Sequence, residues 1–223
     1  MTKKLKQVEK NKLIFWLPFI FLLIIVANIL ILFKYLLPFP PWKFNGIATL
    51  IYLLSLAIVG LALRKCKLKF KDIGYSNFRV KDIAWAFLFF ILAIFVWAGV
   101  IKILEILGIP EWKTDDPFID LPTALISLPF ALLIAPITEE TLFRGVLITA
   151  LKEKVKLWPA CVLSIFFFAL HHLFPFGVGA FIHILFWAPF PTVLFIWKKS
   201  IYPSIIMHIT NNIFGYLIIP LIF

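Results

Sequence analysis

Seven long apolar segments, separated by short charged loops, constrain this chain more than any other feature. They cover residues 13–33, 46–63, 83–104, 121–151, 157–173, 177–197 and 201–222. A helix of about 20 apolar residues crosses the ~30 Å hydrocarbon core of a bilayer. Inside lipid only helices and closed barrels satisfy every backbone hydrogen bond. The sequence therefore predicts an all-α transmembrane bundle, embedded in the cell membrane as a multi-pass protein.

Composition supports this interpretation. The chain has 223 residues and is 63% hydrophobic, with a mean hydropathy of +1.03. Soluble domains are about 45–50% apolar, so a water-soluble fold of this size is excluded. The fourth segment is longer than one straight crossing and contains Pro136, which should kink or break a helix. The expected number of spans is therefore about seven, within six to eight.

The charged loops predict the orientation. The net charge is +11, and the basic residues concentrate in the N-terminal tail and in residues 64–82, 152–156 and 198–199. With seven spans these stretches fall on one side, which the positive-inside rule makes cytoplasmic, together with the N-terminus. The opposite side receives four acidic residues: Glu111, Asp115, Asp116 and Asp120. Basic residues in short loops indicate contact with membrane lipid and no nucleic-acid partner.

The chain is predicted to form a single membrane domain over residues 1–223, without internal repeats. The stretch 64–82 is the only loop long enough for further structure, and an interfacial piece is expected around Phe70–Phe78.

Several polar residues lie inside apolar segments, where ionisable groups are costly and usually functional. They are Glu139, Glu140, Arg144, His171, His172, His183, His208, Asn211 and Asn212. Glu140 and Arg144 are four residues apart, so on a helix they share a face and should pair. Glu139 points about 100° away from Glu140 and should stay free of the arginine. The same reasoning predicts that His171 faces away from His172 and serves packing.

The polar residues of separate spans lie at a similar depth. At about 1.5 Å per residue, Glu139 lies ~20 Å from the loop at Lys152, and His172 lies ~22 Å beyond Leu157. His208 and Asn212 lie ~14–20 Å beyond the loop at residues 198–199 on the same rule. We therefore expect these side chains to meet in one site within the membrane.

The residue types indicate hydrolysis by activated water. A carboxylate such as Glu139 can act as a general base, and histidine and amide groups can orient water or stabilise an oxyanion. The set of Glu139, His172, His208 and Asn212 could also bind a divalent metal such as zinc. The sequence lacks the HExxH of a zincin helix, and no GxSxG surrounds Ser164 or Ser204.

Three stretches in this order, EETLFR, FALHH and HITNN, resemble the EExxxR, FxxxH and HxxxN motifs of the CPBP intramembrane proteases, also called the CAAX protease and bacteriocin-processing (Abi) family. The resemblance covers Glu139 to Asn212. It implies that Glu139 activates water and that Glu140 and Arg144 form a supporting pair. His172 would then be the catalytic histidine of the second motif, although His171 also follows a phenylalanine by four residues.

The resemblance further implies that His208 and Asn212 stabilise an oxyanion or bind a metal. We place the catalytic core at residues 121–223 and expect an intramembrane endopeptidase. Its substrates would be peptides, CAAX-like proteins or membrane proteins. Two alternatives stay open at this point: a non-catalytic bacteriocin-immunity or scaffold protein of the same fold, and a proton-coupled transporter that uses the same polar cluster.

Overall fold

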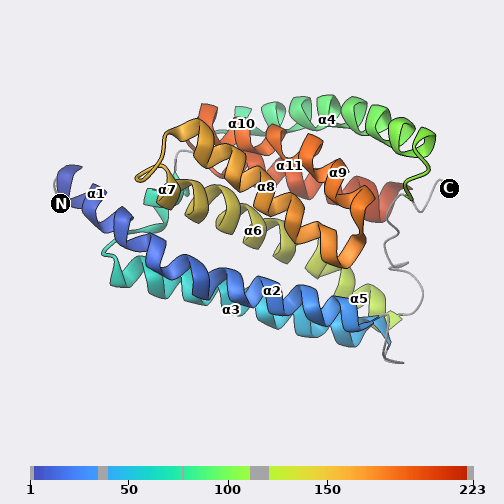
Figure 1. Ribbon diagram of the computed structural model, residues 1–223, viewed down its shortest axis with the longest axis horizontal. Helices are drawn as coiled ribbons and strands as arrows, with labels where there is room; N and C mark the ends of the chain where they lie inside the picture. The colour runs from blue at the N-terminus through green and yellow to red at the C-terminus, as the bar shows by residue number, and fades with distance from the viewer. Residues whose placement is uncertain (1–2, 35–39, 77, 111–120, 220–223) are drawn as a thin grey trace.

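Helices make up all the regular structure in the part of the chain that the computed structural model describes, which is residues 3–34, 40–76, 78–110 and 121–219 (Figure 1). In the N-terminal half these elements are α1 (Lys3–Leu13), η1 (Ile14–Trp16), α2 (Leu17–Lys34), α3 (Pro41–Lys65), η2 (Phe70–Ile73) and α4 (Lys81–Ile106). In the C-terminal half they are α5 (Leu121–Pro129), η3 (Phe130–Ile134), α6 (Ala135–Glu140), η4 (Thr141–Leu147), α7 (Ile148–Leu151), α8 (Leu157–Phe176), α9 (Val178–Trp187), α10 (Pro189–Lys198), α11 (Tyr202–Ile213) and η5 (Phe214–Ile218).

Six helical runs in the described residues are long and apolar enough to cross a membrane. They are Gln7–Leu30, Trp42–Lys65, Lys81–Ile106, Leu121–Leu151, Leu157–Phe176 and Val178–Lys198. The seventh predicted segment is also helical, as α11 and η5, but it is more polar than the others. The structure therefore confirms a helical membrane bundle with a number of spans inside the predicted range.

The fourth segment is one continuous helical run from α5 to α7, and not two pieces. Two stretches of it, η3 and η4, are π-helical. A π-turn shifts the hydrogen-bond register by one residue, and η3 ends two residues before Pro136. We attribute the survival of the helix past this proline to that shift, which accommodates the missing backbone donor.

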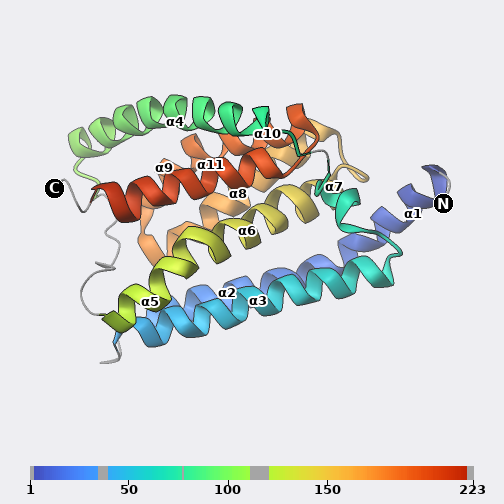
Figure 2. The ribbon, with the colours of Figure 1, turned by 180° about the vertical axis from the view of Figure 1, so that it is seen from behind.

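This long central helix lies between two groups of helices. In Figures 1 and 2 the pair α2–α3 covers one side of α6, and α8, α9 and α11 cover the other, with α4 outermost. The contacts agree, because α6 packs against both α3 and α11, while α4 packs against α9 and α11. A side chain on α6 or η4 can therefore meet residues from both halves of the chain.

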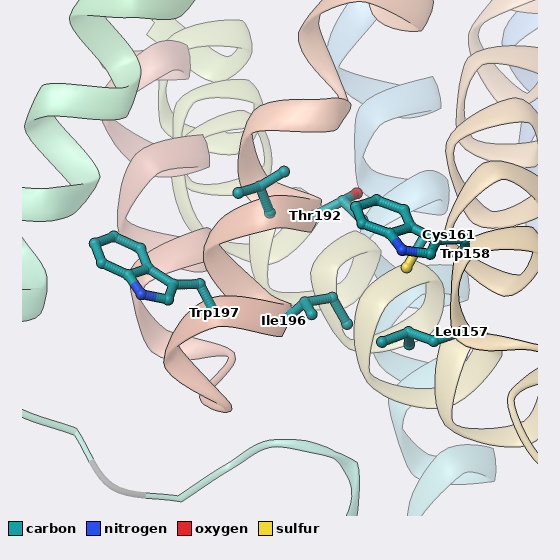
Figure 3. A pocket seen from close by; sticks show the side chains of 7 residues that line it. Leu157, Trp158, Cys161, Thr192, Ile196 and Trp197 are labelled. Carbon is teal, nitrogen blue, oxygen red and sulfur yellow. The ribbon is translucent and has the colours of Figure 1, made fainter.

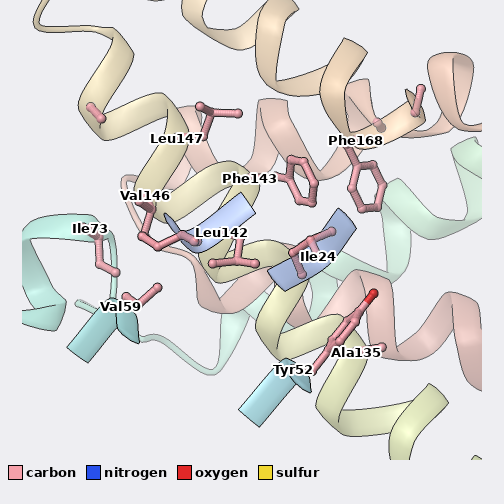
Figure 4. Close-up of a cluster of buried hydrophobic side chains, with 14 of the residues drawn as sticks. Ile24, Tyr52, Val59, Ile73, Ala135, Leu142, Phe143, Val146, Leu147 and Phe168 are labelled. Atoms are coloured by element: carbon pink, nitrogen blue, oxygen red, sulfur yellow. The ribbon is translucent and has the colours of Figure 1, made fainter. Parts of the chain in front are cut away.

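All seven residues of η4 are buried. Figure 4 shows Leu142, Phe143, Val146 and Leu147 of this turn among side chains from other helices, including Ile24 of α2. In contrast, the outer faces of the bundle carry large exposed apolar side chains, such as Phe95 and Trp158. Such an exterior suits lipid and not water, so the bilayer covers the outside while the polar groups are held near the centre.

The basic segments gather at one end of the bundle. The N-terminus, the stretch containing η2, and the connection from α7 to α8 all lie at this end in Figures 1 and 2. The loop 64–82 contains the short helix η2, within the stretch where a piece of structure was predicted, and its Ile73 is buried. The main-chain carbonyl of Gly74 accepts a hydrogen bond from the Ile201 amide at 2.9 Å, which ties this loop to the start of α11. The predicted acidic cluster Glu111, Asp115, Asp116 and Asp120 lies outside the described residues.

Candidate active site

Glu140 and Arg144 form the buried pair that their spacing predicts. Arg144 Nη1 donates to Glu140 Oε1 at 3.0 Å, and neither side chain has exposed surface. The guanidinium also donates to the Ala188 carbonyl at 3.2 Å and to Thr192 Oγ1 at 3.3 Å. Its carbon lies 4.3 Å from the centre of the Phe168 ring. These partners on α8, α9–α10 and α6 satisfy a buried cation, so the pair also fixes how those helices pack.

His208 of α11 bridges the two glutamates. Its Nδ1 lies 3.0 Å from Glu140 Oε1, and its Nε2 lies 3.8 Å from Glu139 Oε2. An ionised carboxylate only accepts hydrogen bonds, so Nδ1 carries a proton and donates to Glu140. The Nε2 atom is thereby directed at Glu139. The structure thus brings together three of the predicted site residues, Glu139, Glu140 and His208, from α6 and α11.

His172 is held by its own helix. Its Nδ1 lies 2.9 Å from the carbonyl oxygen of Phe168, one turn earlier on α8. Since a carbonyl only accepts, Nδ1 must be the protonated nitrogen, and Nε2 keeps its lone pair for a proton or a cation. The Phe168 ring packs edge-on against the imidazole, with 4.8 Å between ring centres. The Phe168 ring therefore packs against the His172 ring, and the main-chain carbonyl one turn earlier fixes the His172 tautomer.

His171 also lies at the site, contrary to the prediction that it faces away. Its Nε2 lies 3.5 Å from Glu139 Oε1 and 3.0 Å from the Tyr52 hydroxyl. The centres of the His171 and His172 rings are 4.8 Å apart. Side chains about 100° apart on a helix can both reach a carboxylate that lies between their two directions. Glu139 thus meets two neighbouring faces of α8, and not the single face that the spacing predicted.

Two further contacts come from the N-terminal helices, which the sequence did not implicate. The hydroxyl of Tyr52 on α3 donates to Glu139 Oε1 at 3.1 Å. The amide nitrogen of Asn28 on α2 lies 2.7 Å from His171 Nδ1 and 3.1 Å from the His171 carbonyl oxygen. Asn28 is a lone amide in a strongly apolar span, which is a signal that could have marked it. Tyr52 carries no comparable signal.

Asn212 is hydrogen-bonded to the main chain of η3 and to its neighbour Asn211. Its amide nitrogen donates to the Ala131 carbonyl of η3 at 2.8 Å, and its oxygen accepts from the Asn211 amide at 3.3 Å. Asn211 in turn accepts from the indole of Trp187 at 3.0 Å, joining α11 to α9. Both asparagines thus hold helices together. One N–H of the Asn212 amide remains for another acceptor, because an amide nitrogen carries two.

The site fits a divalent metal only in part. One donor atom each from Glu139, His171 and His172 lies within 4.8 Å of the others, a spacing that could hold a metal ion. His172 suits this role, because its Nε2 has a lone pair. His171 does not suit a ligand role, because each of its ring nitrogens already has a hydrogen-bond partner. The predicted ligand His208 is not in this group. Glu139 and His172 alone are fewer protein ligands than a catalytic zinc site has.

A separate apolar pocket of about 130 Å³ lies between α8 and α10 (Figure 3). Its lining consists of Leu157, Trp158, Cys161, Thr192, Val193, Ile196 and Trp197. It carries no charged group and opens among the exposed apolar side chains of two membrane-crossing runs. Contact with lipid accounts for this surface, and the polar cluster around Glu139 does not line it.

The family model described as Type II CAAX prenyl endopeptidase Rce1-like matches residues 121–214, from the start of α5 to the beginning of η5. Residues 121–214 are therefore similar to the Rce1-like family. The match confirms the resemblance that the three motifs indicated, and the family's description is that of an endopeptidase. No curated protein and no solved structure matches the chain. The family match and the six apolar helices together show that the chain is a multi-pass membrane protein.

The Rce1-like region supplies the glutamates, the arginine and the histidines of the site. Asn28 and Tyr52, which contact His171 and Glu139, lie outside it. The site is therefore completed by helices that precede the matched region.

Proposed function

We propose that this chain is an intramembrane endopeptidase in which Glu139 activates the attacking water. The main support for this proposal is the burial of Glu139 and its contacts with two histidines and a tyrosine, within a region that matches the Rce1-like family. Its carboxylate is only 5% exposed and is contacted by His171, His208 and Tyr52. A buried carboxylate surrounded by donors and imidazoles is suited to taking a proton from water and returning it.

The reaction follows from the residues at hand. Water attacks the carbonyl carbon of the scissile peptide, and its proton passes to Glu139. His172 accepts a hydrogen bond from the same water at Nε2 and orients it. When His208 carries a proton on Nε2, that N–H faces the place where negative charge develops, and Asn212 can add its second N–H. The C–N bond then breaks, and the proton on Glu139 passes to the leaving amine.

Glu140 and Arg144 support this reaction without taking part in the bond changes. The carboxylate of Glu140 fixes the Nδ1 proton of His208, and Arg144 neutralises that carboxylate. We propose the core 121–223 as the unit that carries the chemistry, and membrane-associated peptides, including CAAX-like ones, as the substrates.

A divalent metal such as zinc is the second candidate for activating the water. The spacing of Glu139, His171 and His172 favours it. His172 and His208 each donate from Nδ1, an arrangement common in zinc ligands. If this candidate is right, purified active protein contains about one metal per chain and a chelator abolishes cleavage. Full activity of metal-free protein would reject it.

The proposed function is tested with purified protein in lipid vesicles and a panel of membrane peptides, with the products identified by mass spectrometry. Glu139→Gln should lower cleavage by about 10²–10⁴-fold, the range for a general base. The matched control is Glu105→Gln, which alters an exposed glutamate paired with Lys102 and should keep full activity. An absence of product from every peptide, with folding intact, would contradict the proposal and favour the immunity or scaffold protein. Proton flux across the vesicles without any product would favour the transporter.

A further inference from the structure

Four side chains form a chain of hydrogen bonds that ends on the proposed base. It runs from Asn28 through His171 and Tyr52 to Glu139, and the two outer helices α2 and α3 supply the first and third members. All four side chains are buried. The chemistry proposed above uses neither Asn28 nor Tyr52, so their presence beside Glu139 needs a separate account.

Asn28 determines which group donates and which accepts in this series of hydrogen bonds. One atom of its amide lies near two groups of His171: the carbonyl oxygen at 3.1 Å and Nδ1 at 2.7 Å. A carbonyl oxygen only accepts, so the atom facing it must be the amide nitrogen, whose two N–H groups serve both contacts. Rotating the amide would set two oxygens against each other. His171 Nδ1 is therefore an acceptor, and the ring proton sits on Nε2.

The proton on Nε2 of His171 determines the direction of the two remaining hydrogen bonds. The Nε2–H of His171 donates to the Tyr52 hydroxyl oxygen at 3.0 Å, and the Tyr52 hydroxyl donates to Glu139 Oε1 at 3.1 Å. Each donated hydrogen from Asn28 to Glu139 is used once, whereas the Asn28 amide oxygen is buried without a hydrogen-bond partner among the described residues. The Tyr52 ring itself is packed edge-on against Phe130 of η3, with 5.1 Å between ring centres.

The geometry points to Asn28, His171 and Tyr52 as positioning residues that hold one oxygen of Glu139, so that the other oxygen faces the attacking water. This inference rests on the proposed function. Oε1 accepts from Tyr52, whereas Oε2 is the oxygen nearer to His208. A hydrogen bond to one oxygen restricts the rotation of the carboxylate, and a misplacement of about 1 Å at a reacting group can cost about 100-fold in rate. The N-terminal helices would thus act on catalysis without touching the substrate.

The first test compares Tyr52→Phe with Tyr75→Phe in the peptide-cleavage assay. Tyr52→Phe removes only the hydroxyl that holds Glu139, and it should lower kcat about 10–100-fold with KM unchanged. Tyr75→Phe is the matched control, because the Tyr75 hydroxyl is hydrogen-bonded to Thr141 Oγ1 at 2.6 Å on the same long helix, one residue after Glu140. It should keep wild-type kcat. Equal values for the two variants, or a loss confined to KM, would overturn the inference.

The second test asks whether His171 acts as a donor from Nε2. In His171→Gln the side-chain amide nitrogen reaches the place of Nε2 and can donate, whereas in His171→Asn it reaches only the place of Nδ1. His171→Gln should therefore keep at least about tenfold more activity than His171→Asn. If His171 were a base or a metal ligand, neither amide would replace it. Equal inactivity of the two variants would therefore reject the positioning role.

The third test does not depend on activity. The chain has only four histidines, so their ¹⁵N signals can be assigned by substitution. We expect His171 as the Nε2–H tautomer and His172 as the Nδ1–H tautomer. Asn28→Ala should raise the share of the Nδ1–H form at His171, and Asn45→Ala, which removes an amide bonded to Ser127, should not. An Nδ1–H form of His171 in the wild type, or no response to Asn28→Ala, would refute the inference.

The two levels of failure are distinguishable. If the wild-type protein cleaves no peptide, the proposed function fails, whatever the tautomers are. If it cleaves and Tyr52→Phe behaves as the wild type does, only the positioning inference fails.

Discussion

At the residue scale, the Glu140–Arg144 pair has the greatest consequence for stability. Both side chains lie wholly inside the bundle. Removing one partner leaves the other charge buried without compensation, whereas removing both leaves none. Geometry therefore predicts opposite outcomes for single and double substitutions at this pair.

Arg144→Met should lower the free energy of unfolding by about 3–5 kcal/mol. The double variant Glu140→Gln/Arg144→Met should recover most of that loss while staying inactive, because His208 loses the carboxylate that orients it. Denaturant titration in detergent micelles measures both. Lys102→Met, which breaks an exposed pair, is the control and should change stability by less than about 1 kcal/mol. Equal destabilisation by the single and double variants would show that an uncompensated Glu140 charge is not the cause of the loss.

At the element scale, the short helix η2 is pressed against the central helix. A Cβ added at Gly145 in η4 would lie 3.0 Å from the main-chain oxygen of Ile73 and 3.3 Å from Ile201 Cδ1. A main-chain atom cannot swing aside as a flexible side chain can, so the two elements would have to separate. The close approach of η2 therefore depends on glycine at this position.

Gly145→Ala should destabilise the protein by about 1–3 kcal/mol, the usual cost of overpacking. The matched control is Gly99→Ala on α4, where an added Cβ meets nothing within 4 Å. That control should be neutral or slightly stabilising, since alanine favours a helix. Thermal unfolding in detergent distinguishes the two, and an unchanged midpoint for Gly145→Ala would show that η2 is free to move.

At the scale of the whole molecule, the two halves of the chain complete one site. The family match begins at residue 121, yet α2 packs on α8, α3 on α6 and α4 on α11. A fragment of residues 121–223 should therefore be inactive alone. Co-expression with residues 1–110 should restore cleavage, because membrane helices inserted separately can associate. Full activity of the C-terminal fragment alone would mean that α2 and α3 are dispensable.

The orientation of the bundle gives a second prediction at this scale. The native Cys66 and Cys161 are both buried, so a cysteine introduced at the surface should dominate labelling by an impermeant maleimide. Glu105→Cys, at the far end of α4, should react in intact cells. Lys69→Cys, in the basic loop, should react only after permeabilisation. The reverse pattern would invert the predicted topology.

The sequence by itself determined the class of fold and one buried ion pair of the candidate site. Runs of apolar residues can satisfy their backbone in lipid only as helices, so segment length and composition were sufficient for the bundle. The pairing of Glu140 with Arg144 also followed from spacing, because a helix places residues four apart on one face.

Only the tertiary structure decided what surrounds Glu139. His171 proved to contact it, Asn212 to bond the Ala131 carbonyl, and Tyr52 to donate from a helix that carries no motif. These contacts depend on how α2, α3, α8 and α11 rotate and pack around the central helix. Periodicity gives the faces of one helix but not which neighbour each face meets, because that choice is made by packing between segments far apart in the chain.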